Sequence, residues 1–176
     1  MQTEQVGLNK YPNAEPRIAS LLGALEEVTR DCRLDMISDV TEPEMIVWQP
    51  YPNSHSIGAI LLHIIDVEAW WISEFGADIP RTPDELKLYL SSETDQERGI
   101  WPSPPNLPLE WYLDLHDEVR DRSLQLVVEW TDPDEEIRKR DKPLTRGWVL
   151  AHVAAHEAYH YGQIMLLIDL YKRQGT

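Results

Sequence analysis

Apolar residues recur with helical spacing in four segments of the chain, with no strand-like alternation between them. The segments span residues 15–38, 57–75, 107–131 and 145–173. An apolar stripe on a helix packs against neighbouring helices. The pattern therefore predicts an all-α protein built as a four-helix bundle. In the first segment, the stripe consists of Ile18, Leu21, Leu22, Leu25, Val28, Cys32 and Met36.

The second segment is apolar on two sides, which is typical of a helix that is buried nearly all round. It includes His63, which we therefore expect inside the protein. Ser56 has the side chain of a helix N-cap, and Gly76 can end the helix.

A long connection, residues 76–106, separates the second and third helices. It contains one short helix signal at 82–85, where threonine precedes proline and an acidic residue stands at the third position. The rest, down to the W-P-S-P-P run at 101–105, predicts a proline-rich surface crossing. A crossover of this length lets two consecutive helices run in the same direction, which a short loop prevents.

Composition favours one globular domain, residues 1–176, with 42% hydrophobic and 27% charged residues. No apolar run reaches membrane-spanning length, and residues 1–5 lack the basic flank and apolar stretch of a secretory signal. Cys32 is the only cysteine, so we expect no intrachain disulfide and a cytoplasmic location. The net charge of −15 disfavours a nucleic-acid partner.

Three histidines, His152, His156 and His160, stand four residues apart in the last helical segment. Residues four apart share a helix face and rise about 6 Å, so an adjacent pair can bind one metal ion. The outer two lie about 12 Å apart along the axis, so all three cannot bind the same ion. An ion here needs a further ligand from elsewhere in the chain. The remaining histidines are His55, His63 and His116.

The histidines of this segment lie on the helix face that packs against the other helices. Burying an imidazole costs free energy unless its ring nitrogens find a hydrogen-bond partner or a metal ion. We expect His63 to face them from the second helix. We expect His55 and His116 at the surface or at a helix flank, since His116 stands in an acidic stretch. Three neutral imidazoles suit zinc, nickel or another late first-row ion. They leave an open position for water or substrate, which is the pattern of a catalytic site.

Two motifs stand out in the sequence: S-I-G-A-I-L-L-H at 56–63, followed by Trp70-Trp71, and H-V-A-A-H-E-A-Y-H-Y-G-Q at 152–163. They resemble the DinB-like superfamily, in which one histidine of the second helix and two of the last helix bind a metal ion. The resemblance implies that His152 is not a ligand. Tyr161 departs from the pattern, since many members have arginine there. The ligands that the resemblance implies are His63, His156 and His160.

The resemblance, which extends over essentially the whole chain, also implies up-down-down-up connectivity and a homodimer. Members with assigned chemistry look like metal-dependent transferases that join a low-molecular-weight thiol to an electrophile, or like an isomerase that uses such a thiol. We therefore expect a small-molecule substrate, one divalent metal ion and a thiol cosubstrate. Glu157 and Asp66 are the candidates to orient a ligand or move a proton, although both also fit an ordinary helix carboxylate.

Other functions use the same residues. The H-E-x-x-H match at 156–160 is the zinc-protease signature, but the residues after it contain only Asp169 as a further acidic ligand candidate. One Glu-x-x-His pair, Glu157 with His160, occurs without the second pair that a di-iron bundle needs. A hydrolase that uses metal-activated water and a stress-linked binding protein without turnover both stay open. Aromatic candidates for a pocket are Trp48, Tyr51 and Trp70.

Overall fold

The computed structural model describes residues 10–95, 97–137 and 143–174. The described part is mostly helical, which confirms the all-α prediction. None of its helices is long and apolar enough to cross a membrane. The prediction about a secretory signal concerns residues 1–5, which lie outside the described residues.

Four long helical stretches carry the fold: α1 (Pro16–Asp39), α3 (Ile57–Glu68) with its continuation η1 (Ala69–Gly76), α5 (Leu109–Val127) and α6 (Arg146–Arg173). The connections contain the short helices α2 (Pro43–Val47) and α4 (Pro83–Leu88). Between α5 and α6, strands β1 (Glu136–Ile137) and β2 (Leu144–Thr145) pair antiparallel, with Glu136 opposite Thr145 and Ile137 opposite Leu144.

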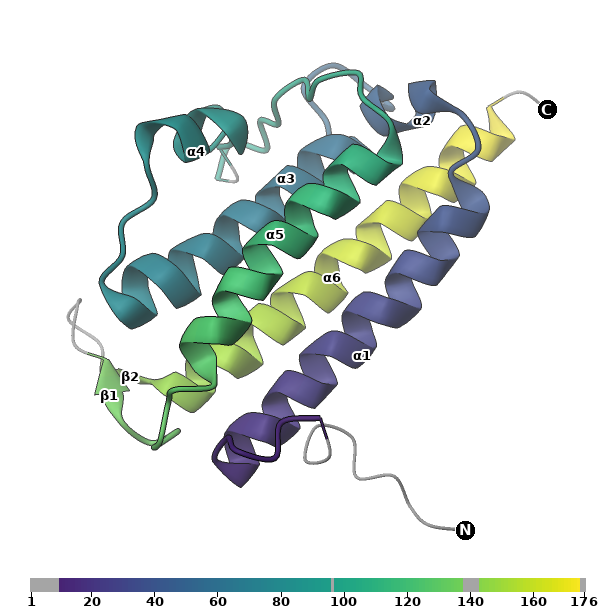
Figure 1. The fold of residues 1–176 in the computed structure, drawn as a ribbon. Helices are drawn as coiled ribbons and strands as arrows, with labels where there is room; N and C mark the ends of the chain where they lie inside the picture. The colour runs from purple at the N-terminus through teal and green to yellow at the C-terminus, as the bar shows by residue number, and fades with distance from the viewer. Residues whose placement is uncertain (1–9, 96, 138–142, 175–176) are drawn as a thin grey trace, which may run out of the picture.

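The long helices pack side by side: α6 lies against α1 and α3, and α3 lies against α5 (Figure 1). Every residue of α3 from Ile57 to Ile65 is buried, as its two-sided apolar pattern predicts. The buried apolar side chains form two large clusters, one that includes Ile60, Tyr112 and Ile164 and one that includes Leu22, Val127 and Val149. Both clusters join residues that are far apart in the sequence.

The starts of the two histidine-bearing helices are set by capping side chains. The Ser56 hydroxyl accepts a hydrogen bond from the backbone N–H of Ala59 at 3.3 Å, as predicted. At the start of α6, the Thr145 hydroxyl accepts from the backbone N–H of Trp148 at 3.1 Å. The short helix α4 begins with the capping box expected at Thr82.

Some local features differ from the sequence prediction. The second helix changes to π geometry after Glu68 and ends at Gly76, although its apolar spacing predicts one continuous α-helix. The third helix spans Leu109–Val127 and is shorter at both ends than the predicted 107–131. The helix α2 and the two strands were not predicted, because elements of five and two residues are too short to show a period.

Candidate metal centre

Helices α3 and α6 bring three histidines to one point. Nε2 of His156 lies 3.1 Å from Nε2 of His63 and 3.1 Å from Nε2 of His160. One ligand atom from each of the three lies within 4.8 Å of the other two. Two nitrogens that bind one tetrahedral zinc ion at about 2.0–2.1 Å are about 3.3 Å apart. The three imidazoles therefore have the spacing of a group that could hold a metal ion.

The three imidazoles have the protonation state that a metal ion needs. Burial, together with the charge of neighbouring imidazoles, lowers the pKa of His63 and of His156 to about 3. Burial also lowers the pKa of His160, although a hydrogen bond to Gln163 opposes this shift. All three are therefore neutral at pH 7, the form in which imidazole donates a lone pair to a metal ion.

Gln163 orients one of these rings. Its amide nitrogen donates a hydrogen bond to the Tyr159 hydroxyl at 3.2 Å, which turns its amide oxygen toward Nδ1 of His160 at 2.7 Å. Because that oxygen can only accept, Nδ1 of His160 carries the proton and Nε2 keeps its lone pair. A partner of this kind fixes both the tautomer and the direction of a metal-binding histidine.

Aromatic rings flank the three histidines. Trp101, from the crossover before α5, packs edge-on against His63 with ring centroids 5.3 Å apart. His55, which precedes α3 and is half-buried, packs on Trp101 at 4.3 Å. On α6, His152 stacks on Trp148 at 4.7 Å and lies outside the three-histidine group. The three histidines are bordered by Trp101 from the crossover and by Tyr159 on α6, whose ring centroid lies 5.1 Å from that of His160.

The two carboxylates that the sequence suggests for proton transfer have other partners. Asp66 accepts a hydrogen bond from the Ser91 hydroxyl at 2.7 Å and forms an ion pair with Arg81, so it ties the crossover to α3. Glu157 is 1% exposed and pairs with Arg120 at 2.6 Å. Among the described residues, the three-histidine group includes neither carboxylate. These contacts indicate structural roles and give no support to proton transfer by either residue.

The prediction that His116 lies at the surface or at a helix flank is wrong. Its side chain is fully buried, with Nε2 3.3 Å from Glu68 Oε2 and 3.2 Å from Arg120 Nη2. Successive side chains on a helix point about 100° apart. The neighbours Asp117 and Glu118 are therefore exposed although His116 faces the core. An acidic stretch of sequence thus does not predict an exposed histidine.

Comparison with protein-family models matches residues 36–171 to the DinB family. The chain belongs to the DinB family. The matched part begins at the end of α1 and includes both histidine-bearing helices, so it contains the whole three-histidine group. No curated protein matches the chain.

The aromatic candidates for a pocket have different environments in this DinB-family protein. Trp48 packs edge-on against Tyr171 with ring centroids 5.5 Å apart, about 16 Å along α6 from His160. Tyr51 is 64% exposed. Trp70 packs edge-on against Trp71 on η1, with centroids 4.5 Å apart. Trp101 packs on His63 and lies 6.1 Å from His160 between ring centroids, whereas Trp48 and Trp70 each pack on another aromatic side chain.

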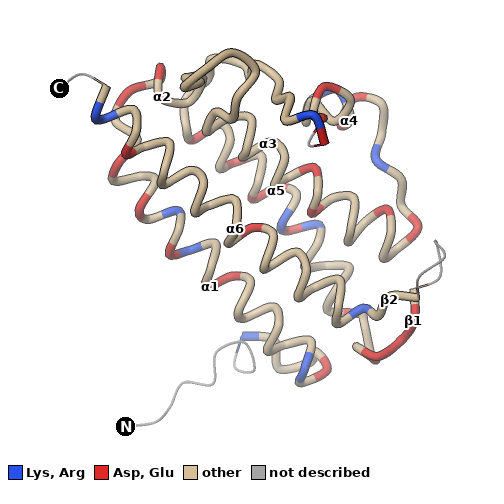
Figure 2. The backbone as a smooth tube through the Cα atoms, turned by 180° about the vertical axis from the view of Figure 1, so that it is seen from behind, with Lys and Arg blue, Asp and Glu red and all other residues tan. Residues whose placement is uncertain are grey.

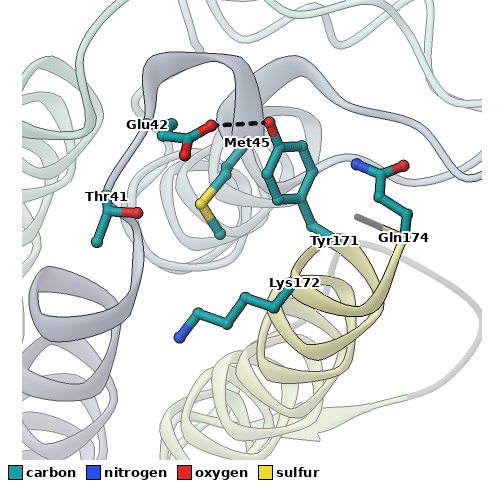
Figure 3. Close-up of a pocket in the computed structure, with 6 residues that line it drawn as sticks. All are labelled: Thr41, Glu42, Met45, Tyr171, Lys172 and Gln174. Atoms are coloured by element: carbon teal, nitrogen blue, oxygen red, sulfur yellow. Dashed lines mark hydrogen bonds between the residues drawn. The ribbon is translucent and has the colours of Figure 1, made fainter. Parts of the chain in front are cut away.

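A surface pocket of about 410 Å³ lies near the carboxyl end of α6 (Figure 3). Tyr171, which lines it, packs against Trp48. The Tyr171 hydroxyl donates a hydrogen bond to Glu42 across it at 3.1 Å. Lys172 forms an ion pair with Asp39 at 2.5 Å. The pocket has none of the three histidines in its lining. Its lining consists of Thr41, Glu42, Met45, Tyr171, Lys172 and Gln174.

The sequence reasoning assigns no contact to two residues that touch the histidines, Trp101 and Gln163, or to Arg120, which pairs with Glu157. Trp101 stands in a crossover without periodicity, so nothing in the sequence connects it with His63. Gln163 stands three residues after His160, a spacing that brings side chains together on a helix and could have indicated the contact. Arg120 stands four residues after a buried position of α5, on the face that the apolar stripe follows. A charged residue on such a stripe is a usable signal of a buried ion pair.

Proposed function

We propose that this DinB-family protein binds one divalent metal ion, zinc or nickel, through His63, His156 and His160. The observation that carries the proposal is the approach of three imidazoles, with Nε2 atoms 3.1 Å apart in two of the three pairs. Nitrogen lone pairs at this spacing repel one another unless a proton or a cation lies between them. Imidazole is a ligand that both ions accept.

The protein side chains would prepare the site for a small substrate. Gln163 holds the ring of His160 with its lone pair directed at the other two histidines. Trp101 covers one side of His63 and limits the approach of water there. Three protein ligands leave one position open. A divalent ion held there supplies a Lewis acid that favours the deprotonated form of an incoming thiol or water.

We further propose that the reaction is the transfer of a low-molecular-weight thiol to a small electrophile. Membership of the DinB family and the incomplete ligand set support this reaction. Cys32, the only cysteine, is not part of the three-histidine group, so the thiol is a cosubstrate rather than a side chain. A cytoplasmic location agrees with this proposal, because that compartment keeps small thiols reduced.

Metal analysis of the purified, untagged protein is the first test, with His63→Ala and His152→Ala beside the wild type. We expect about one equivalent of zinc or nickel in the wild type and in His152→Ala, and none in His63→Ala. The two variants are matched, because both remove a histidine that packs against aromatic rings. Equal loss of metal in both would contradict the ligand assignment.

Turnover then separates the possible functions of a metal-loaded protein. Consumption of an electrophile only when a small thiol is present supports the transferase. Cleavage of esters, amides or lactones without any thiol would support a hydrolase instead. If the protein binds metal but turns over substrates in neither assay, the result would support a non-catalytic binding protein. Each assay includes His63→Ala, so that activity from free metal is recognised.

We propose that the four long helices form the up-down-down-up bundle that the DinB resemblance implies. The course of the helices in Figure 1 supports this connectivity. There α3 and α5 both run from the end near α2 toward the end near the strands, whereas α1 and α6 run the opposite way. The long crossover that includes α4 is what allows two consecutive helices to run in parallel.

We also propose a homodimer that forms through the exposed face of α6. Between Gly147 and Ile168, α6 has one charged residue, Glu157, and most of this helix is accordingly tan in Figure 2. Glu157 is buried. In a chain with a net charge of −15, an uncharged face is where two copies meet with least repulsion. The exposed apolar side chains on α6 are Trp148, Ala151, Ala155, Ala158, Tyr159, Leu166 and Leu170.

Light scattering of Leu166→Glu tests the dimer. Leu166 is 58% exposed on the apolar face. A carboxylate at this position has to be desolvated in the dimer, so we expect this variant to be monomeric. The control is Leu88→Glu on α4, since Leu88 is 40% exposed and lies on a different element. A dimeric Leu166→Glu, or a monomeric wild type, would contradict the proposed interface.

A further inference from the structure

A second cluster of ionisable side chains lies in the interior, outside the three-histidine group. Its members are Glu68, His116, Arg120 and Glu157, none of which is more than 5% exposed. Charges at this depth are tolerated only when they are paired and hydrogen-bonded. The contacts of each charge therefore decide what the cluster can do.

One guanidinium pairs with both carboxylates. Arg120 donates two hydrogen bonds to Glu68, from Nε to Oε1 at 2.9 Å and from Nη2 to Oε2 at 2.8 Å. Its Nη2 also donates to Glu157 Oε2 at 2.6 Å, and its Nη1 donates to the Thr29 hydroxyl at 2.8 Å. Burial disfavours the charged carboxylate, but Arg120 and His116 outweigh it and hold the pKa of Glu68 well below its usual range.

The cluster contains the residue types of a metal site, but Arg120 takes the place of a cation. Glu68, His116 and Glu157 offer ligand atoms that lie within 4.8 Å of one another. The guanidinium is hydrogen-bonded to both carboxylates, and a metal ion beside it would meet strong repulsion. The carboxylates are thus neutralised by a side chain of the protein, which makes the cluster a connection between helices.

The two carboxylates stand on the two helices that carry the histidines. Glu68 is the last residue of α3, five residues after His63, and Glu157 directly follows His156 on α6. Five residues correspond to about 7.5 Å along a helix axis. Arg120 on α5 therefore joins α3 to α6 about one and a half turns along α3 from the point where the histidines meet.

We propose that Arg120, through Glu68 and Glu157, positions the three histidines for metal binding; this inference rests on the proposed metal site. A rotation of α6 by about 10° moves a side-chain tip that is about 5–6 Å from the helix axis by about 1 Å. Metal–ligand distances tolerate only about 0.2 Å. Arg120 opposes such a rotation because its planar fork holds Glu68 through two hydrogen bonds and its Nη2 holds Glu157 Oε2 through one. The Thr29 hydroxyl, which accepts from Arg120, donates to the other Glu157 oxygen at 2.6 Å. Arg120 is therefore a positioning residue.

The test compares Glu157→Gln with Glu68→Gln, which keep the side-chain shape and each remove one charge from a different helix. We measure zinc affinity by competition with a chromophoric chelator, and the absorption spectrum of the cobalt(II)-loaded protein. We expect each variant to bind zinc about 10- to 100-fold more weakly and to change the cobalt spectrum, which reports ligand geometry. A loss confined to Glu157→Gln would overturn the inference, because it would indicate a direct role for Glu157 at the ion.

Arg122→Met is the matched control. Arg122 stands two residues after Arg120 on α5, and its side chain pairs with Glu85 at the start of α4. This variant removes an ion pair of α5 that does not touch α3 or α6, so we expect the zinc affinity and cobalt spectrum of the wild type. Urea denaturation of each metal-free variant shows that it is folded before metal is added.

A single substitution in the cluster can prevent folding, because it leaves a buried charge without its partner. The triple variant Glu68→Gln, Arg120→Met, Glu157→Gln removes all three charges and leaves none of them unpaired. It also tests whether this cluster positions the three histidines for metal binding. Wild-type affinity and spectrum in the folded variants would overturn the positioning role and leave the metal site intact. A wild-type protein that binds neither zinc nor cobalt would overturn the metal site itself, and the positioning role with it.

Discussion

The reactivity of Cys32 tests where the thiol of the proposed reaction comes from. Burial, together with the negative charges of Glu157, Asp35 and Asp31, raises the pKa of this thiol to about 11. At pH 8, a thiol of pKa 11 is about 0.1% thiolate, whereas an ordinary cysteine of pKa about 8.5 is about 24% thiolate. Cys32 should therefore react with an alkylating reagent about 200-fold more slowly than an unperturbed cysteine.

Alkylation by iodoacetamide between pH 7 and pH 10, followed by mass spectrometry, measures this pKa. We expect the rate for native Cys32 to rise about tenfold per pH unit over the whole range, because the thiolate fraction rises until the pH reaches the pKa. The same protein unfolded in urea is the reference, and its rate should level off near pH 9. A native rate that levels off below about pH 9.5 would refute the reasoning. It would also make Cys32 a possible nucleophile.

Three further predictions concern single side chains. Gln163→Leu should weaken zinc binding about 10- to 100-fold, measured by chelator competition, because it frees the ring of His160; unchanged affinity would contradict the orienting role. Asp66→Asn should speed proteolysis within the crossover 77–106, measured by limited trypsin digestion, and leave zinc affinity unchanged. Gly58→Ala should destabilise the protein by about 1–3 kcal/mol in urea denaturation, since its Cβ would lie 2.8 Å from the Tyr112 hydroxyl; wild-type stability would contradict this packing.

The long helices could be predicted from the sequence because burial repeats with the helical period. In α3 the apolar pattern predicts that all sides are covered, and even the polar His63 is only 8% exposed. The change to π geometry after Glu68 cannot be recognised in the apolar pattern of the sequence. It shifts the direction of the side chains of Trp70 and Trp71 without changing which residues are apolar. Periodicity therefore predicts which segments are buried, but not how each turn is wound.

The candidate ligands could be named from the sequence because each belongs to a short motif whose residues are close together in the chain. His156 and His160 share a helix face by their spacing, and the motif supplies His63 as their partner. The partner of Glu157 could not be named, because Arg120 stands 37 residues earlier on a different helix. Side chains that meet only through packing leave no signature in either segment. The H-E-x-x-H pattern could therefore suggest catalysis for a glutamate that forms a buried ion pair.

The position of the ion cluster around Arg120 beside the three-histidine group gives a reason for keeping charges in the core. Replacing a buried ion network by apolar residues often leaves stability unchanged or raises it, so stability alone is a weak reason for Arg120 and its carboxylates. Apolar packing tolerates small rotations of a helix, because its contacts have no direction. The guanidinium of Arg120 binds Glu68 through two hydrogen bonds, and Arg120 and Thr29 each donate one to Glu157, so both carboxylates are held in a defined orientation. A site assembled from His63 on α3 and from two histidines on α6 needs that directional restraint between the same two helices.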